Sequence, residues 1–183
     1  FSGFVVNEKT LRRPRPTPVF FHLRLNTPVL AMDGWRGRKV MPGVAEIEGG
    51  GIGALLTLAP GKEPVLMQVG ISYTSADGAR RNLEAEIPHW DFDRVAGEAR
   101  EEWNEALSRI RVAGGTKKAR SRFYTDLFHA LQGRRTISDY DGRYSDQTGE
   151  ERTVRRLPRD ENGRPRHAHF NSDSFWGAQW TIQ

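Results

Sequence analysis

The sequence contains no cysteine among its 183 residues. Disulfide bonds and thiolate metal sites are therefore excluded within this chain, although the redox compartment stays open. No hydrophobic run reaches the roughly 20 residues that a membrane-spanning helix needs, and there is no apolar signal segment and no initiator Met. We expect no membrane partner, while the missing signal segment says nothing about secretion.

The charge balance is only moderately basic. Lys and Arg number 28 against 23 Asp and Glu, which gives a net charge of +5. The excess is mostly arginine spread along the chain, and Asp160 and Glu161 interrupt its densest run, residues 152–166. We interpret these arginines as solvated side chains and expect no nucleic-acid partner. The alternative is a non-catalytic, Arg-rich module for anionic polymers, which predicts one contiguous basic face and binding that weakens steeply with salt.

Short strands joined by Gly and Pro turns dominate the first half of the chain, a pattern typical of antiparallel sandwiches. The strongest strand is residues 19–25, where apolar and polar side chains alternate. The glycine-rich run 49–53 lacks the Lys-Ser/Thr of a phosphate loop and is interpreted as a hairpin connection. Further strands are predicted at 1–6, 44–48, 54–58 and 65–72, and a turn at 33–37.

Helical spacing replaces the strand pattern in the second half. A short helix or helical turn is predicted at 75–86, and a longer helix at 90–110 with Asp91 or Asp93 as its N-cap. A third helix begins at Thr116, ends at Gly133 and is expected to be buried on most of its circumference. Its apolar positions are Ala119, Phe123, Tyr124, Leu127, Phe128, Ala130 and Leu131.

The sequence from 139 to the end is predicted to form a turn, a long loop at 143–167 and a helix that starts at Phe170. Asp139 and Asp141 can bind a cation, but they do not fit the spacing of an EF-hand loop. A structural Asp-Gly turn is the favoured interpretation. His167 and His169 have no acidic neighbours, so no metal site is predicted there.

Several of these segments together resemble a known family. Phe123-Tyr-Thr-Asp-Leu-Phe-His129, followed by Asp139-x-Asp-Gly-x-Tyr144, resembles the signature of glycoside hydrolase family 92, the calcium-dependent exo-acting α-mannosidases. Blocks similar to that family precede it in the family's order. They are Val69-Gly-Ile-Ser-Tyr-Thr-Ser75, Ala79-Arg-Arg-Asn-Leu-Glu84 and Trp103-Asn-x-x-Leu107.

The resemblance implies a mixed α and β fold and an internal piece of a protein several times longer. Residues 1–88 would be the end of an antiparallel N-terminal β-sandwich domain, and 89–115 a linker helix. Residues 116–183 would begin a truncated (α/α)₆ catalytic toroid. The expected partners are the remainder of the same polypeptide and a mannose-containing glycan, and the expected location is secreted or periplasmic.

The implied activity is an inverting, Ca²⁺-dependent cleavage of terminal α-linked sugars, above all α-mannosides. Such chemistry needs two carboxyl groups roughly 6.5–9.5 Å apart. In the family these groups and the Ca²⁺ ligands lie downstream, at positions that this chain does not contain. We therefore assign no catalytic residue and no metal ligand here, and we predict that this piece alone is inactive.

One segment matches a block that lines the family's sugar pocket, a Leu-Trp-Asp-Thr-x-Arg-like sequence. In Phe175-Trp-Gly-Ala-Gln-Trp180 the first Trp matches, but Gly177 replaces the Asp and Trp180 replaces the Arg. For Trp180 helix packing is favoured, while for Trp176 a pocket wall and core packing stay equally open. The lost carboxylate predicts a specificity shifted away from plain mannosides. The candidate substrate-binding residues are Trp176, Asp173 and Gln179.

Overall fold

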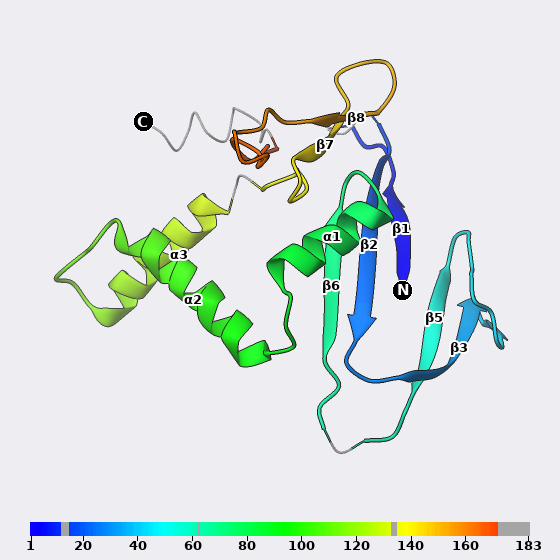
Figure 1. Ribbon diagram of the computed structural model, residues 1–183. Helices are drawn as coiled ribbons and strands as arrows, with labels where there is room; N and C mark the ends of the chain where they lie inside the picture. Colours follow the sequence, from blue (N-terminus) through cyan, green and yellow to red (C-terminus); the bar gives the residue numbers. More distant parts are fainter. Residues whose placement is uncertain (12–14, 62, 133–134, 172–183) are drawn as a thin grey trace. The chain divides into compact units, whose positions relative to one another are not determined.

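The structure, a computed structural model, describes residues 1–11, 15–61, 63–132 and 135–171. The chain forms two compact units (Figure 1). One contains residues 1–23 together with the described residues from 69 onward, and the other contains residues 24–68. None of the described helices is long and apolar enough to cross a membrane.

A three-stranded sheet of order β1-β2-β6 organises the first unit (Figure 1). Strand β1 (Ser2–Asn7) pairs antiparallel with β2 (Thr17–Leu25), in a register that sets Ser2 opposite His22. Along β6 (Met67–Ser72) exposed and buried side chains alternate, so one face of this strand is covered. The predicted strands at 1–6, 19–25 and 65–72 are confirmed.

The second unit holds an antiparallel sheet of order β4-β3-β5. Its strands are β3 (Val29–Arg36), β4 (Lys39–Met41) and β5 (Ile52–Leu58). The strand predicted at 54–58 is confirmed. The turn predicted at 33–37 is wrong, because β3 continues to Arg36 and the chain reverses only at Gly37, whose φ is +58°.

The strand predicted at 44–48 is also wrong. This segment forms no ladder, and its apolar side chains cover one face of β3 instead. A Cβ added to Gly34 would lie 2.5 Å from Val44 Cγ2 and 3.2 Å from Ile47 Cδ1. The alternation of apolar residues therefore reflects packing over a glycine rather than strand pairing.

Three helices follow β6: α1 (Ala76–Glu86), α2 (Phe92–Ser108) and α3 (Lys117–Leu131). Each begins after a residue whose side chain accepts a hydrogen bond from a first-turn N–H, as N-caps do. These N-caps are Ser75, Asp91 and Thr116. The predicted helices are confirmed, and no helix interrupts the described strands β1 to β6.

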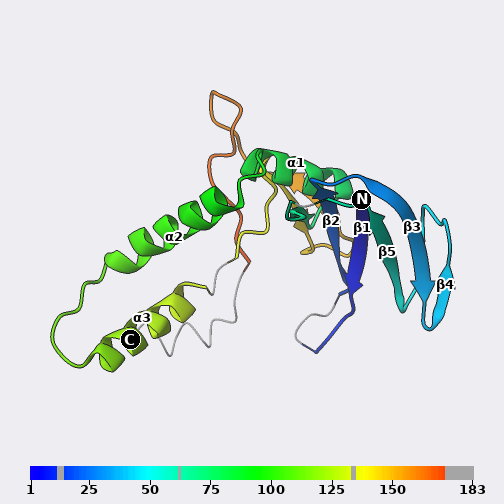
Figure 2. The same cartoon turned by 90° about the horizontal axis from the view of Figure 1, so that it is seen from below.

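Helices α2 and α3 lie side by side in both views (Figures 1 and 2). The ring centroids of Trp103 and Phe128 are 4.4 Å apart, and the Tyr124 hydroxyl donates to the Ile110 carbonyl at 3.2 Å. No residue of α3 is buried, and 36% of Phe123 is exposed. The prediction that this helix is buried on most of its circumference is therefore wrong for the described chain, in which α2 covers one side of it. Gly133 lies outside the described residues.

The segment predicted as a long loop contains a β-hairpin, which corrects that prediction. Strand β7 (Arg143–Asp146) pairs antiparallel with β8 (Thr153–Arg156), and the Arg155 Nε lies 2.7 Å from the Asp146 carboxylate. The arginine-rich composition hid these strands, because charged side chains give no hydrophobic alternation. Of the helix predicted from Phe170, only Phe170 and Asn171 are described, and Phe170 forms an isolated β-bridge with Thr136.

Arg152 fastens this hairpin to the sheet of the first unit. Its Nη2 donates to the carbonyls of Tyr73 at 2.9 Å and Thr74 at 3.0 Å, just beyond β6. Its Nε donates to Ser145 Oγ at 3.0 Å, and its guanidinium lies 5.7 Å from the centroid of the Phe20 ring. Hydrogen bonds from a charged guanidinium are among the stronger ones, so the hairpin is held firmly at the end of the sheet.

Helix α1 packs directly on β6 because the strand carries glycine at the contact. A Cβ added to Gly70 would clash with the Ala79 carbonyl oxygen and lie 2.7 Å from Leu83 Cβ. Ala79 is 0% exposed and Leu83 2% exposed. This contact fixes α1 against the sheet and forms the core of the first unit's described part.

We predict that Gly70→Ala lowers the free energy of unfolding by about 2 kcal/mol, since an extra methyl here must displace backbone. The matched control is Gly97→Ala in α2, where an added Cβ meets nothing within 4 Å. There the change should stabilise by about 0.5–1 kcal/mol, because glycine costs entropy inside a helix. Urea denaturation followed by circular dichroism measures both, and equal effects at the two sites would contradict the packing account.

Candidate functional site

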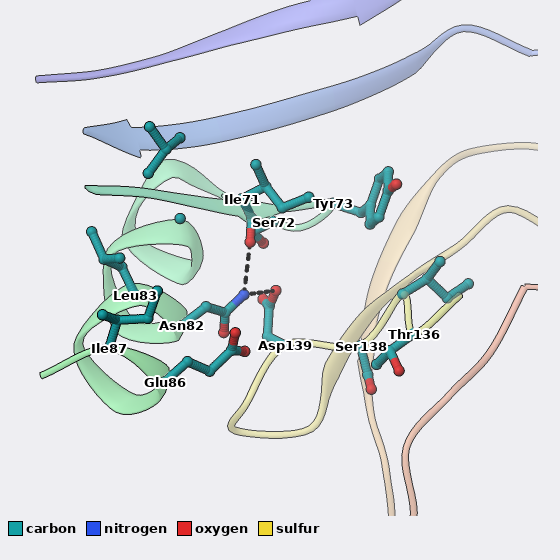
Figure 3. Close-up of a pocket in the computed structure, with 13 residues that line it drawn as sticks. Ile71, Ser72, Tyr73, Asn82, Leu83, Glu86, Ile87, Thr136, Ser138 and Asp139 are labelled. Carbon is teal, nitrogen blue, oxygen red and sulfur yellow. Dashed lines mark hydrogen bonds between the residues drawn. The ribbon is translucent and has the colours of Figure 1, made fainter. Parts of the chain in front are cut away.

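A pocket of about 260 Å³ lies beside the carboxyl end of β6 (Figure 3). Three segments line it: residues 69–73, the second half of α1, and residues 136–139 between α3 and β7. Its polar groups include the side chains of Asn82, Glu86 and Asp139 (Figure 3). The pocket therefore lies where the strand-rich and the helical parts of the sequence meet within one unit.

Asp139 is the most deeply buried carboxylate of this pocket, with 5% of the residue exposed. Its Oδ1 accepts a hydrogen bond from Asn82 Nδ2 at 2.9 Å, and its Oδ2 accepts one from the Thr74 hydroxyl. Its backbone N–H donates to the Arg143 carbonyl at 2.7 Å. A buried charge is tolerated only when hydrogen bonds replace its hydration, and these side chains supply that replacement.

Asn82 joins three elements through its single amide group. Its Nδ2 donates to the Ile71 carbonyl and to Asp139, both at 2.9 Å (Figure 3). Its Oδ1 accepts from the Tyr140 N–H at 2.8 Å. Both amide protons are thus used. The residue connects β6, α1 and the turn that follows Asp139.

The segment 139–144 forms the turn that the sequence predicts. Gly142 has φ +81°, and Asp141 Oδ2 lies 3.0 Å from Arg143 Nε and 3.6 Å from Arg81 Nη2. The carboxylates of Asp139 and Asp141 are therefore occupied by protein donors rather than arranged around a common point. In the part of the chain that the structure describes, no group of three or more His, Cys, Asp or Glu residues could hold a metal. These residues do not fit a Ca²⁺ site.

Glu86 is the pocket residue that sequence reasoning missed. It lies four positions after Asn82, which places both side chains on one face of α1 (Figure 3). Although Glu86 is exposed at the pocket's edge, the neighbouring protein atoms partly desolvate its carboxyl and raise its pKa above the usual value. The helical spacing from Asn82 was the available signal, but it became informative only once Asn82 was known to face the pocket.

The structure does not describe the sugar contacts that the sequence predicts. Trp176, Asp173 and Gln179 lie outside the described residues, as do Gly177 and Trp180. Their roles stay predictions. Of the two histidines considered as ligands, His169 contacts the Tyr144 ring, with centroids 4.5 Å apart and the ring planes tilted by 42°. His167 Nδ1 lies 3.1 Å from the Ala168 carbonyl oxygen.

Comparison with known proteins identifies the family. The model of the glycosyl hydrolase family 92 catalytic domain matches residues 78–183, more than half of the chain. The chain belongs to glycosyl hydrolase family 92. The match begins inside α1, so it includes Asn82, Glu86 and the Asp139 turn.

Solved family 92 structures share the fold. An inverting mannosidase from Bacteroides thetaiotaomicron superposes with a TM-score of 0.73 at 21% identity, over 87% of this chain and 21% of that one. A second family 92 glycosyl hydrolase gives a TM-score of 0.75 at 21% identity, over 88% of this chain and 20% of its own. This family 92 chain therefore spans about a fifth of the length of the solved structures it matches.

A curated relative comes from Arthroderma benhamiae and is named an uncharacterized secreted glycosidase. It is 39% identical over 57 residues, which is 30% of this chain and 7% of that protein. This chain is therefore similar to a protein named as a glycosidase, but only over a short stretch.

We predict that Asp139→Ala lowers the free energy of unfolding by about 3 kcal/mol, because it leaves buried donors on Asn82 and Thr74 without an acceptor. Asp126→Ala in α3 is the control. That carboxylate is 73% exposed and lies 3.7 Å from Arg122, so its loss should cost no more than about 0.5 kcal/mol. Thermal and urea unfolding of the two variants would refute the prediction if their losses were the same.

Proposed function

We propose that this chain is part of a longer family 92 glycosidase that removes terminal α-linked sugars, with α-mannosides as its substrates. The observation that carries the proposal is the family match over 78–183, supported by the shared fold. In this proposal β1, β2 and β6 belong to the end of a β-sandwich, and α3 is the first helix of an (α/α)₆ toroid. We also propose the domain boundaries predicted from the sequence, which lie after residues 88 and 115.

The proposed chemistry is inverting hydrolysis. One carboxylic acid protonates the leaving oxygen while a carboxylate activates water on the opposite face of the sugar, which requires a separation of roughly 6.5–9.5 Å. We place both groups, and a Ca²⁺ ion that binds sugar hydroxyls, on parts of the polypeptide beyond this chain. The chain's own residues hold the structure around which those parts assemble, and we propose that it is inactive alone.

The proposed setting is extracellular or periplasmic, where glycans occur, and it is supported by the relative named as secreted. The proposed partners are a mannose-containing glycan and the remainder of the same polypeptide. An Arg-rich module for anionic polymers is the rival interpretation. Against it, many arginines in the described part form ion pairs with Asp or Glu side chains. They are Arg80, Arg81, Arg94, Arg122, Arg143 and Arg155.

The decisive experiment compares the longer protein with this chain. We expect the longer protein to release sugar from an aryl α-mannoside, to lose that activity with a Ca²⁺ chelator and to regain it with Ca²⁺, whereas the 183-residue chain should release none. Stereochemistry of the first product, followed by NMR, should show inversion. No turnover of any α-glycoside by the longer protein, together with salt-sensitive binding to heparin, would favour the rival.

For Trp176 we predict a role in sugar binding, since an indole face suits the C–H face of a pyranose. In the longer enzyme Trp176→Ala should lower kcat/KM at least tenfold, equivalent to about 1.4 kcal/mol, with little change in melting temperature. A sharp fall in melting temperature with normal turnover would show instead that Trp176 is a core residue. We also propose that Gly177, which replaces the family's Asp, shifts the specificity away from plain terminal mannosides. An unmodified enzyme that prefers plain terminal α-mannosides would refute this second proposal and leave the role of Trp176 untouched.

A further inference from the structure

Two segments far apart in the sequence pair just before the described chain ends. The Ile137 N–H donates to the His169 carbonyl at 2.8 Å, and the Asn171 N–H donates to the Arg135 carbonyl at 3.0 Å. The Arg135 N–H returns a bond to Asn171 Oδ1 at 2.7 Å. Residues 135–138 therefore pair antiparallel with residues 169–171 around the isolated β-bridge of Thr136 and Phe170, and we call this pair the exit ladder.

The exit ladder is attached to the pocket through consecutive residues. Ser138 Oγ accepts the His169 N–H at 3.0 Å, and the next residue is the buried Asp139. Asp139 in turn is held by the Asn82 amide, which also reaches the Ile71 carbonyl of β6. Hydrogen bonds, together with the peptide bond between Ser138 and Asp139, thus connect β6 through α1 to residues 169–171.

Within this path Asn82 is the residue whose side chain makes the most hydrogen bonds. It is 8% exposed, and its amide bonds two backbone groups, on β6 and on the turn, besides the Asp139 carboxylate. A side chain that only stabilised α1 would not need to contact the Tyr140 N–H. These contacts instead set the position of the turn relative to the sheet, and therefore the position of the exit ladder.

We propose that Asn82 is a positioning residue of the glycosidase. Through Asp139 it fixes the position of the exit ladder. The link to catalysis rests on the proposed function, because Trp176 follows a few residues later in the sequence. The link to the exit ladder rests on the geometry alone, and the two parts can be tested separately.

Hydrogen exchange of individual backbone amides in the 183-residue chain tests the geometric part. In Asn82→Ala we expect the amides of Ile137, His169 and Asn171 to exchange at least tenfold faster, while amides inside α2 and α3 keep their rates. Arg80→Ala is the matched control on the same helix. Its side chain is 42% exposed and pairs with Asp77 and Glu84, so the exit ladder should be unaffected.

Trp103→Ala provides the opposite control, because it weakens the α2–α3 contact and should leave the exit ladder protected. If Asn82→Ala does not fold, Asn82→Asp keeps the side-chain size and the acceptor for the Tyr140 N–H, and the same selective loss of protection is expected. The proposal is overturned by unchanged exchange at the three amides, by an equal increase in α2 and α3, or by a failure of both variants to fold.

Kinetics of the longer enzyme test the link to catalysis. Asn82→Ala should lower kcat/KM at least tenfold at a temperature where it is folded, whereas Trp103→Ala with a similar fall in melting temperature should keep its kcat/KM. Equal kinetic losses in both variants would reduce Asn82 to a general stability residue. If the unmodified enzyme cleaves no glycoside, the proposed function fails, and the exchange experiment still decides whether Asn82 controls the exit ladder.

Discussion

The first unit depends on one buried carboxylate. Asp139 loses its hydration on burial. Hydrogen bonds from the Thr74 hydroxyl, on the loop after β6, and from the Asn82 amide, on α1, replace the bonds to water. Because each of those donors belongs to a different element, the charge is satisfied only when strand, helix and turn are all in place. Removing any partner leaves a polar group in a region that water reaches poorly, which is costly and makes the arrangement cooperative.

This requirement explains several neighbouring residues. A Cβ on Gly78 would lie 2.7 Å from Asp139 Oδ2 and 2.8 Å from Ser72 Oγ, so the first turn of α1 can approach the carboxylate only with glycine there. Gly70 plays the corresponding part on the strand, where it admits the backbone of α1. Arg152 holds the loop after β6, because its guanidinium donates hydrogen bonds to the carbonyls of Tyr73 and Thr74. Polar contacts rather than a large apolar core thus hold this junction together.

The sequence predicted the elements that carry their own local signal. Thr116 and Asp91, which was one of two candidates, are N-caps at the start of helices with apolar periodicity, and alternation marked residues 19–25. It failed where the pattern had another cause. The apolar residues at 44–48 alternate because they cover Gly34, and the β7–β8 hairpin is held by backbone pairing and arginine contacts that leave no hydrophobic period.

The candidate site was less accessible to sequence reasoning than the fold. The turn at 139–144 was correctly predicted, because Asp-Gly has a local preference for turns. The pairing of Asp139 with Asn82 joins residues 57 positions apart, and no local rule encodes it. Glu86 was missed for the same reason. Long-range complementarity between single polar groups becomes visible only when the backbone brings them together.

The distribution of exposed apolar surface supports the proposal that more polypeptide surrounds this chain. In the described part only three apolar side chains are buried, those of Ala79, Leu83 and Leu157, and no large side chain is fully buried. On β6, Val69 is 45% and Ile71 54% exposed, on the face opposite to the one that packs α1. Phe123 and Leu131 of α3 are also open. Large apolar faces of this kind are unfavourable in water, so a second sheet layer and further helices are the physically expected cover.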